Sequence, residues 1–374
     1  MVALTTGRVR RLSGLAAVLA CLCAGPLDAA AQTARAKAAP ARTTAPARPV
    51  KKAVTPKKTA KVSAAPKASS KGASTASRTS SAARRRAIAR ARAAARAREA
   101  RELARPRFRT DDSGREVPAP RAAAALIYDP DTDTVLFEEN AGDQRSIASI
   151  TKVMTALVFL ESLTEPSTEV KVVRADVSRA STTYLRAGYT VTVEQLLHLL
   201  LIGSDNAAAR VLARTSPYGT DGFIARMNEK ARELGLANTH FEDPSGLMSG
   251  NVSTAYDLAH LLTFAVADDR ISSVMRKAEY DFVPLKRNVH VNSTNRFVRS
   301  GELEVLGGKT GFISSSGYCL ATLVRLPQTG KQVVFVVLGA RSNAARFSET
   351  KHLFNWLSTT TLAAAAHDGG QGQQ

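Results

Sequence analysis

The segment from residue 32 to about residue 82 restricts folding more than any other feature of the sequence. It is built from Ala, Pro, Lys, Ser and Thr, with hardly an aromatic or large aliphatic side chain. Such a composition cannot bury enough apolar surface to offset the entropy that a chain loses on folding. We therefore expect a disordered, extended linker here, and a folded domain that is confined to the later residues.

The residues before this linker are typical of a secretory signal peptide, expected over residues 1–31. Three arginines lie between residues 8 and 11, an apolar run covers residues 12–25, and Ala29 to Ala31 offer a small-residue cleavage site. The apolar run is too short to span a bilayer. We expect a periplasmic protein with no transmembrane anchor after cleavage. A lipoprotein site at Cys21 is the alternative, but the leucine before Ala20 fits it poorly.

The net charge of +20 comes from one part of the chain. Residues 32–110 hold 23 lysines and arginines against Glu99 and Glu102, so residues 111–374 carry a net charge of −3. We expect a basic arm over residues 32–109, with a transient helix at 83–105 that Pro106 stops. The arm is either a solvated spacer or a binding site for anionic envelope polymers. Nucleic acid is an unlikely partner, because the arm lacks interleaved aromatic residues.

The remaining sequence predicts a mixed domain over residues 110–360. Strand-like runs lie near residues 124–139 and 303–340, helical patterns lie between them, and a last helix is expected over residues 343–358. Strands at both ends of one domain imply an α+β fold, in which both termini build an antiparallel sheet around an inserted helical region. Residues 361–374 are expected to form a disordered tail.

The run "SITK" places Ser149 and Lys152 one helical turn apart, so that the amine can reach the hydroxyl. A serine needs a base to attack an acyl carbon, and a lysine can serve only when desolvation or nearby positive charge lowers its pKa. The apolar run that follows can supply the desolvation. The signal is weak alone, since Ser348 and Lys351 share the spacing and a serine before a helix is commonly a cap.

Two further clusters follow in the chain. In "LIGSDNAAA" an apolar helix breaks into Ser204, Asp205 and Asn206 before another helix begins. In "GGKTGF", residues 307–312, glycines at the start of a strand let the backbone lie close to a ligand while Lys309 presents a charge for a carboxylate.

The order S-x-x-K, S-x-N and K-T-G is the motif set of penicillin-binding proteins and class A β-lactamases. Residues 121 to about 358 resemble the low-molecular-mass penicillin-binding proteins, which are serine-type D-alanyl-D-alanine peptidases with a β-lactamase/transpeptidase-like fold. The stretches "SGNVSTAYDL" and "LGGKTGFISSSGYCLA" are most similar to the periplasmic D-alanyl-D-alanine endopeptidase branch. The resemblance implies peptidoglycan as the substrate, β-lactams as covalent inhibitors and no cofactor.

The resemblance also implies the catalytic roles. Ser149 would be the nucleophile, Lys152 its base, and Ser204 a relay that gives a proton to the leaving amine. The backbone N–H groups of Ser149 and Phe312 would form the oxyanion hole.

The substrate-binding roles are implied in the same way. Asn206 would hold the peptide backbone of the substrate. Lys309, Thr310 and Gly311 would bind the carboxylate beside the scissile bond, and the charge of Lys309 would help to keep Lys152 neutral. The six histidines have no metal-ligand spacing, so no metal site is expected.

Three alternatives stay open. A β-lactamase needs a further carboxylate to activate water, and Glu233 in "ELGLAN" fits the usual motif poorly because the spacing is one residue too long. A noncatalytic polyanion- or wall-binding protein would not need the lysine base. A carboxypeptidase is the nearest alternative, but no further β domain or amphipathic anchor follows the last helix, and we therefore expect an endopeptidase that cuts D-alanyl-diaminopimelate cross-links.

Overall fold

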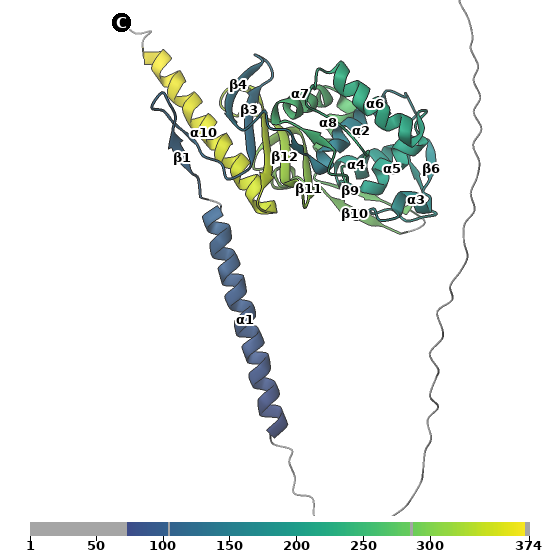
Figure 1. Cartoon of the computed structure of the whole chain (residues 1–374), viewed down its shortest axis with the longest axis horizontal. Coiled ribbons are helices and arrows are strands. Elements are labelled where there is room, and N and C mark those ends of the chain that lie inside the picture. The colour runs from purple at the N-terminus through teal and green to yellow at the C-terminus, as the bar shows by residue number, and fades with distance from the viewer. Residues whose placement is uncertain (1–72, 104, 285–286, 371–374) are drawn as a thin grey trace, which may run out of the picture. The chain divides into compact units, whose positions relative to one another are not determined.

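The computed structural model describes residues 73–103, 105–284 and 287–370 (Figure 1). The expected signal peptide and the first part of the basic arm lie outside these residues. The helices are α1 (Ala73–Leu103), η1 (Ala148–Thr151), α2 (Lys152–Leu160), α3 (Arg174–Val177), α4 (Val193–Leu201), α5 (Asn206–Thr215), α6 (Gly219–Glu233), α7 (Ala255–Val266), α8 (Asp269–Met275), α9 (Arg296–Ser300) and α10 (Asn343–Gly370).

The strands form one large sheet and several short ribbons. The strands are β1 (Phe108–Thr110), β2 (Glu116–Pro118), β3 (Ala124–Asp129), β4 (Thr134–Glu139), β5 (Arg145–Ser146), β6 (Glu169–Lys171), β7 (Thr190–Thr192), β8 (Val252–Ser253), β9 (Glu279–Phe282), β10 (Val289–Asn292), β11 (Glu304–Ile313), β12 (Gly317–Arg325) and β13 (Gln332–Ala340).

The large sheet joins the two ends of the domain. Its strand order is β11-β12-β13-β3-β4, and the neighbouring strands are antiparallel. Val336 of β13 lies opposite Leu126 of β3, so the last strands of the domain pair directly with the first ones. The α+β prediction is therefore confirmed, including a sheet built from both termini with helices inserted between them.

Alternating side chains let this sheet support two hydrophobic layers. Leu126 and Val336 belong to a cluster on one face, whereas Ile127 and Phe335 belong to a cluster on the other. This alternation follows from the period of two residues in a strand. α10 packs on one face of the sheet and α7 on the other, and α2 lies beyond α7 among the remaining helices.

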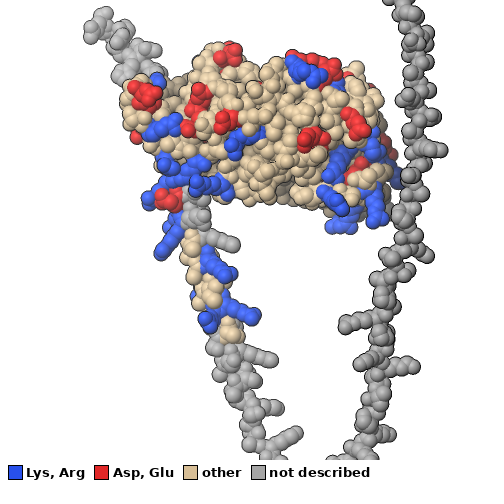
Figure 2. Space-filling model, viewed as in Figure 1, with Lys and Arg blue, Asp and Glu red and all other residues tan. Residues whose placement is uncertain are grey.

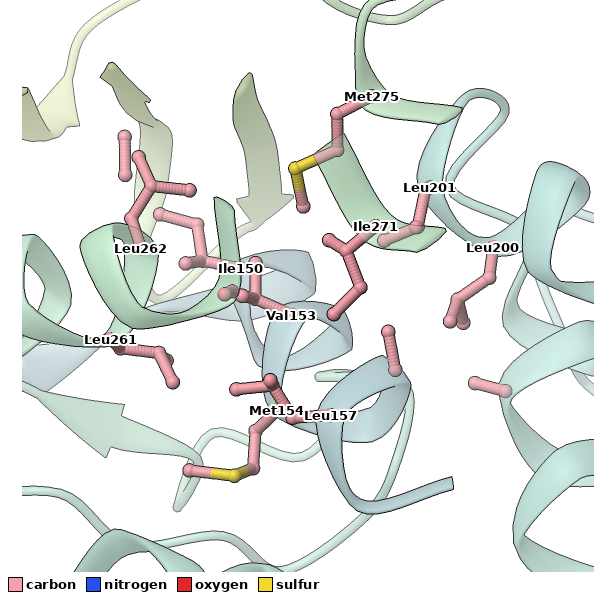
Figure 3. Close-up of a cluster of buried hydrophobic side chains, with 14 of the residues drawn as sticks. Ile150, Val153, Met154, Leu157, Leu200, Leu201, Leu261, Leu262, Ile271 and Met275 are labelled. Carbon is pink, nitrogen blue, oxygen red and sulfur yellow. The ribbon is translucent and has the colours of Figure 1, made fainter. Parts of the chain in front are cut away.

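The helical half is packed around α2. Figure 3 shows Val153, Met154 and Leu157 of α2 among buried side chains of α4, α7 and α8. Every side chain of α2 from Lys152 to Phe159 is buried. A helix that is apolar on all sides is stable only inside a protein, and it places whatever polar groups it carries out of water.

Two helices of the structure extend beyond the expected boundaries. α1 begins at Ala73 rather than near residue 83, because the prolines of the linker end before it and Ala and Ser tolerate a helix. α10 continues to Gly370 where a disordered tail was expected from residue 361; the leucine and four alanines of "TLAAAA" are strong helix formers. β1 also pairs with β2, so ordered pairing begins at Phe108, just before the expected domain start.

No helix within the described ranges is both long and apolar enough to cross a membrane.

Candidate active site

Ser149 and Lys152 meet where η1 leads into α2. Lys152 is fully buried, with no exposed surface, and its Nζ lies 2.8 Å from the Oγ of Ser149. The backbone enters this turn through Ala148, which has a φ of 48°. The predicted contact between the serine and the lysine one turn later is therefore present in the structure.

The amine of Lys152 has two further partners, and both are oxygens that cannot donate a proton. Its Nζ lies 2.6 Å from Oδ1 of Asn206 and 2.5 Å from the carbonyl oxygen of Ser245. The amide of Asn206 is oriented by its own Nδ2, which donates to the carbonyl oxygen of Ala180 at 2.7 Å. A neutral amine can donate to these two acceptors and keep its lone pair for the hydroxyl of Ser149.

Burial lowers the pKa of Lys152 to about 7. The charges of Asp243 and Asp205 raise this pKa, and the charge of Arg210 lowers it, but desolvation is the largest cause. From the sequence we expected desolvation by the apolar run after Lys152, helped by the charge of Lys309. The charges that act on this pKa are those of Asp243, Asp205 and Arg210.

Lys309 of β11 is the second buried amine. Its Nζ donates to Oγ of Ser204 at 2.7 Å and to the carbonyl oxygen of Thr310 at 2.9 Å. Its pKa lies well below the usual range, first because of burial and then because of the charges of Lys152 and Arg346. The repulsion between the two lysines thus acts to lower the pKa of Lys309.

Ser204 sits in a tight turn between α4 and α5. Its φ is 58°, in the left-handed region, which is uncommon for a residue other than glycine. The next residue, Asp205, holds the turn in place: its carboxylate accepts from the backbone N–H of Ala208 at 2.9 Å and of Tyr184 at 2.6 Å. We assigned no role to Asp205 from the sequence, although an aspartate directly before a helix is a common N-cap.

Two glycines lie against the peptide unit that carries the nucleophile. A Cβ on Gly311 would lie 2.6 Å from the carbonyl oxygen of Ile147 and 3.2 Å from the backbone nitrogen of Ser149. A Cβ on Gly246 would overlap the carbonyl group of Ala148, and Gly246 also has a φ of 78°. Only glycine lets β11 and the 243–248 loop approach the nucleophile this closely.

The 243–248 loop is a part of the site that sequence reasoning missed. Asp243 accepts hydrogen bonds from the backbone N–H and the hydroxyl of Ser245, and from the N–H of Met248 at 3.0 Å. These bonds fix the carbonyl of Ser245 that contacts Lys152. The signal was the turn sequence "DPSG", but nothing in it reveals which distant residue its carbonyl faces.

A cavity of about 410 Å³ opens over these groups. It is lined by Ser149, Ser181, Thr182, Gly203, Ser204, Asn206, Leu247, Thr294, Thr310, Gly311, Phe312, Ile313, Ser314 and Arg346. Arg346 of α10 was also missed. Its Nη1 donates to the carbonyl oxygens of Gly311 at 2.9 Å and Cys319 at 3.1 Å, so α10 fixes β11 at the cavity.

The structure brings all the predicted site residues together. The second S-x-x-K pair and Glu233 lie elsewhere. The predicted residues at or beside the cavity are Ser149, Lys152, Ser204, Asn206, Lys309, Thr310, Gly311 and Phe312. Ser348 and Lys351, which share the S-x-x-K spacing, lie on α10, and Lys351 pairs with Glu302 at the surface. Glu233 forms ion pairs with Arg226 and Lys230 and does not line the cavity.

Residues 112–342 match the D-alanyl-D-alanine carboxypeptidase family. The chain is 32% identical over 243 residues to a D-alanyl-D-alanine endopeptidase of Haemophilus influenzae, covering 64% of this chain and 83% of that protein. It is also 32% identical over 255 residues to a D-alanyl-D-alanine carboxypeptidase of Escherichia coli, covering 64% of this chain and 62% of that protein.

The fold is also similar to that of a solved structure. The crystal structure of a Streptomyces DD-transpeptidase matches with a TM-score of 0.60 and 31% identity, over 64% of this chain and 97% of that chain.

Proposed function

The chain belongs to the D-alanyl-D-alanine carboxypeptidase family, and on that premise we propose that it is a serine DD-peptidase that hydrolyses D-alanyl bonds in peptidoglycan through an acyl-enzyme. The observation that carries this proposal is the 2.8 Å contact between Nζ of Lys152 and Oγ of Ser149. A buried amine with a pKa near 7 is the base that a serine nucleophile needs. The reaction needs no cofactor.

Acylation begins at Ser149. Its Oγ forms a bond to the carbonyl carbon of the D-alanyl residue, and its proton passes to the neutral amine of Lys152. Asn206 and Ser245 hold that amine by accepting its two N–H bonds, so its lone pair points at the hydroxyl.

The tetrahedral intermediate carries a negative oxygen. β11 is an edge strand of the sheet, so it has N–H groups on a free edge, and Phe312 of this strand lines the cavity together with Ser149. We assign the oxyanion hole to the N–H groups of these two residues. Removing one donor of such a hole slows catalysis roughly 10²- to 10³-fold.

Ser204 is assigned to the leaving group. Because its Oγ accepts from Lys309 at 2.7 Å, its own proton is free to pass to the departing amine. The C–N bond then breaks, the acyl group stays on Ser149 as an ester, and the proton held by Lys152 replaces the one that Ser204 gave up, so Lys152 is neutral again. In deacylation the oxygen of a water molecule attacks the ester carbon while Lys152 takes a proton from that water. Lys152 then returns this proton to the Oγ of Ser149 as the ester C–O bond breaks, which restores both residues.

The substrate carboxylate beside the scissile bond is assigned to Lys309 and Thr310, with Gly311 keeping the strand close, while Asn206 holds the substrate backbone. Burial disfavours the charged form of Lys309 in the empty site. A bound carboxylate supplies the opposite charge and favours that form again. Binding at this position therefore selects substrates with a carboxylate next to the bond.

Endopeptidase action on D-alanyl-diaminopimelate cross-links is the specificity we propose. The amine released from such a cross-link carries a carboxylate in the same relation to the scissile bond as a terminal D-alanine does. The Haemophilus influenzae relative, which bears the endopeptidase name, supports this choice. The Escherichia coli relative supports D-alanyl-D-alanine carboxypeptidase action as the second candidate.

Digestion of purified sacculi separates these candidates. An endopeptidase converts dimeric muropeptides into monomers, whereas a carboxypeptidase shortens monomeric pentapeptides and leaves dimers intact. Ser149→Ala should abolish either activity, and Ser146→Ala is the matched control in the same short segment. Rapid turnover of a labelled penicillin, rather than stable labelling, would instead indicate a β-lactamase. If the protein does not react with penicillin and only adsorbs to the wall, it is a binding module.

The proposal also covers the location of the enzyme and the role of the basic arm. Export by the signal peptide would place the enzyme in the periplasm, where its substrate lies. The described part of the arm includes exposed arginines along α1, such as Arg84, Arg85 and Arg86. Anionic envelope polymers would bind such an arm through many weak contacts that salt weakens. Sedimentation of the chain with and without residues 32–105 on envelopes across a salt series tests this assignment, and equal retention would leave the arm a spacer.

A further inference from the structure

Three arginines on the chain segment around Ser181 and Thr182, two residues that line the cavity, have no acidic partner among the described residues. Arg174 begins α3, Arg179 follows it, and Arg186 lies before β7; we call these three residues the arginine rim. All three are exposed. In the part of the chain that the structure describes, none of their side chains forms a hydrogen bond or an ion pair.

Neighbouring residues do not neutralise the rim. Asp176 is the one acidic residue of the sequence between Val170 and Val193, and it is buried in an ion pair with Arg214 at 2.9 Å. Arg210 adds another cation, with its Nη1 donating to the carbonyl oxygen of Ser178 at 2.7 Å. Figure 2 shows lysines and arginines gathered over the part of the domain where Figure 1 places α3 and β6.

The rim is attached to the active site through the segment between its arginines. Ser181 and Thr182 line the cavity. The carbonyl oxygens of Ala180 and Thr182 accept from Asn206, at 2.7 Å from Nδ2 and 3.0 Å from the backbone N–H. The bond from the N–H of Tyr184 to the carboxylate of Asp205 adds a third attachment. These bonds hold residues 180–184, the segment between Arg179 and Arg186, against Asp205 and Asn206.

We propose that the arginine rim binds carboxylates of the stem peptide of the substrate, other than the carboxylate beside the scissile bond. This inference rests on the proposed function. A cavity of about 410 Å³ holds only a small part of a cross-linked peptide, so the rest of it must lie over the surrounding surface. Stem peptides carry further carboxylates on their glutamyl and diaminopimelyl residues, and guanidinium groups bind carboxylates in a two-bond geometry.

The test compares two cross-linked muropeptide dimers, one with free carboxylates and one amidated on the carboxylates away from the scissile bond. The variant is Arg179→Gln with Arg186→Gln. The charge-retaining variant has lysine at both positions. The control, Arg232→Gln with Arg299→Gln, removes two exposed arginines that do not line the cavity. Acylation by benzylpenicillin, whose one carboxylate lies next to its reactive bond, reports on the catalytic groups alone.

The glutamine variant should raise KM for the free-carboxylate dimer roughly 5- to 20-fold, since each exposed charge contact contributes up to about a fivefold change in affinity. kcat and penicillin acylation should stay unchanged, because the lost interaction is made equally in the ground state and the transition state. The lysine variant should retain most of the affinity. The difference in KM between the wild type and the glutamine variant should shrink at high salt, because salt screens interactions between exposed charges.

The inference is overturned if KM changes less than twofold, if the control loses as much affinity, or if the amidated dimer shows the same loss. Reduced sedimentation on envelopes with an unchanged KM would assign the rim to a polymer and also overturn it. If the wild-type enzyme is acylated by penicillin but cleaves neither dimer nor monomer, the proposed function itself fails.

Discussion

Nζ of Lys152 lies 2.8 Å from Oγ of Ser149, and among the described residues the hydroxyl of Ser149 is the one hydrogen-bond partner of that amine able to give it a proton. The other two partners, Oδ1 of Asn206 and the carbonyl oxygen of Ser245, can only accept. During acylation, the proton that this amine accepts therefore comes from Ser149.

Lys152→Arg should abolish acylation by β-lactams although the positive charge is kept. A guanidinium group does not deprotonate in proteins and cannot act as the base. Lys351→Arg, on the other S-x-x-K pair, is the matched control and should react like the wild type. Acylation is followed with a fluorescent penicillin on gels, and a Lys152→Arg variant that labels at the wild-type rate would remove the general-base role.

The acylation rate should rise with pH and level off above about pH 7, where the pKa of Lys152 lies. Only the deprotonated amine accepts the serine proton, so each pH unit below this pKa reduces the rate about tenfold. Stopped-flow acylation from pH 5 to 9 measures this profile, with circular dichroism as the control for folding. A rate that is flat or that falls with rising pH in this range contradicts the assignment.

Gly311→Ala should slow acylation by at least about 100-fold, a change typical of lost oxyanion stabilisation. The new Cβ would lie 2.6 Å from the carbonyl oxygen of Ile147, so β11 must move away from the nucleophile. Gly142→Ala is the control, because its Cβ would meet only Tyr256 at an ordinary 4.0 Å. Equal rates in the two variants would mean that this close approach does not matter.

Asp243→Asn should shift the midpoint of the pH profile to lower pH. The charge of Asp243 raises the pKa of Lys152, so removing it lowers that pKa further. The maximum rate should also fall, since the carbonyl of Ser245 loses the hydrogen bonds that position it. Exposed Asp221→Asn should change neither quantity, and an unmoved midpoint in Asp243→Asn would refute this electrostatic coupling.

The motifs allowed much of the site to be predicted because their order along the chain fixed which elements must meet. Ser149, Ser204 and Lys309 come from a helix start, a turn between helices and a strand, and the structure brings the three together as expected. The sheet could also be predicted from the order of elements along the chain. The apolar strand-like runs at the two ends of the domain have no other partners of comparable length, so they must pair with each other.

The supporting groups could not be predicted, because their roles depend on contacts across long sequence distances. Asp243 acts through a backbone carbonyl, which leaves no trace in residue type. Arg346 lies in the predicted last helix, but nothing in the sequence shows that its guanidinium holds the backbone of Gly311. Desolvation of Lys152 was expected from the apolar run that follows it, but the full burial of its side chain among the other helices is seen only in the structure.

The most direct test of the account is to locate the serine that a β-lactam acylates. Trypsin separates the candidates, because Ser149 lies in the peptide Ser146–Lys152, Ser204 in Ala187–Arg210 and Ser348 in Phe347–Lys351. Tandem mass spectrometry then distinguishes Ser149 from Ser146 within the first peptide. We predict a penicilloyl group on Ser149 alone. Modification of Ser146, Ser204 or Ser348, or no covalent adduct at all, would contradict the assignment of this site as a serine DD-peptidase centre.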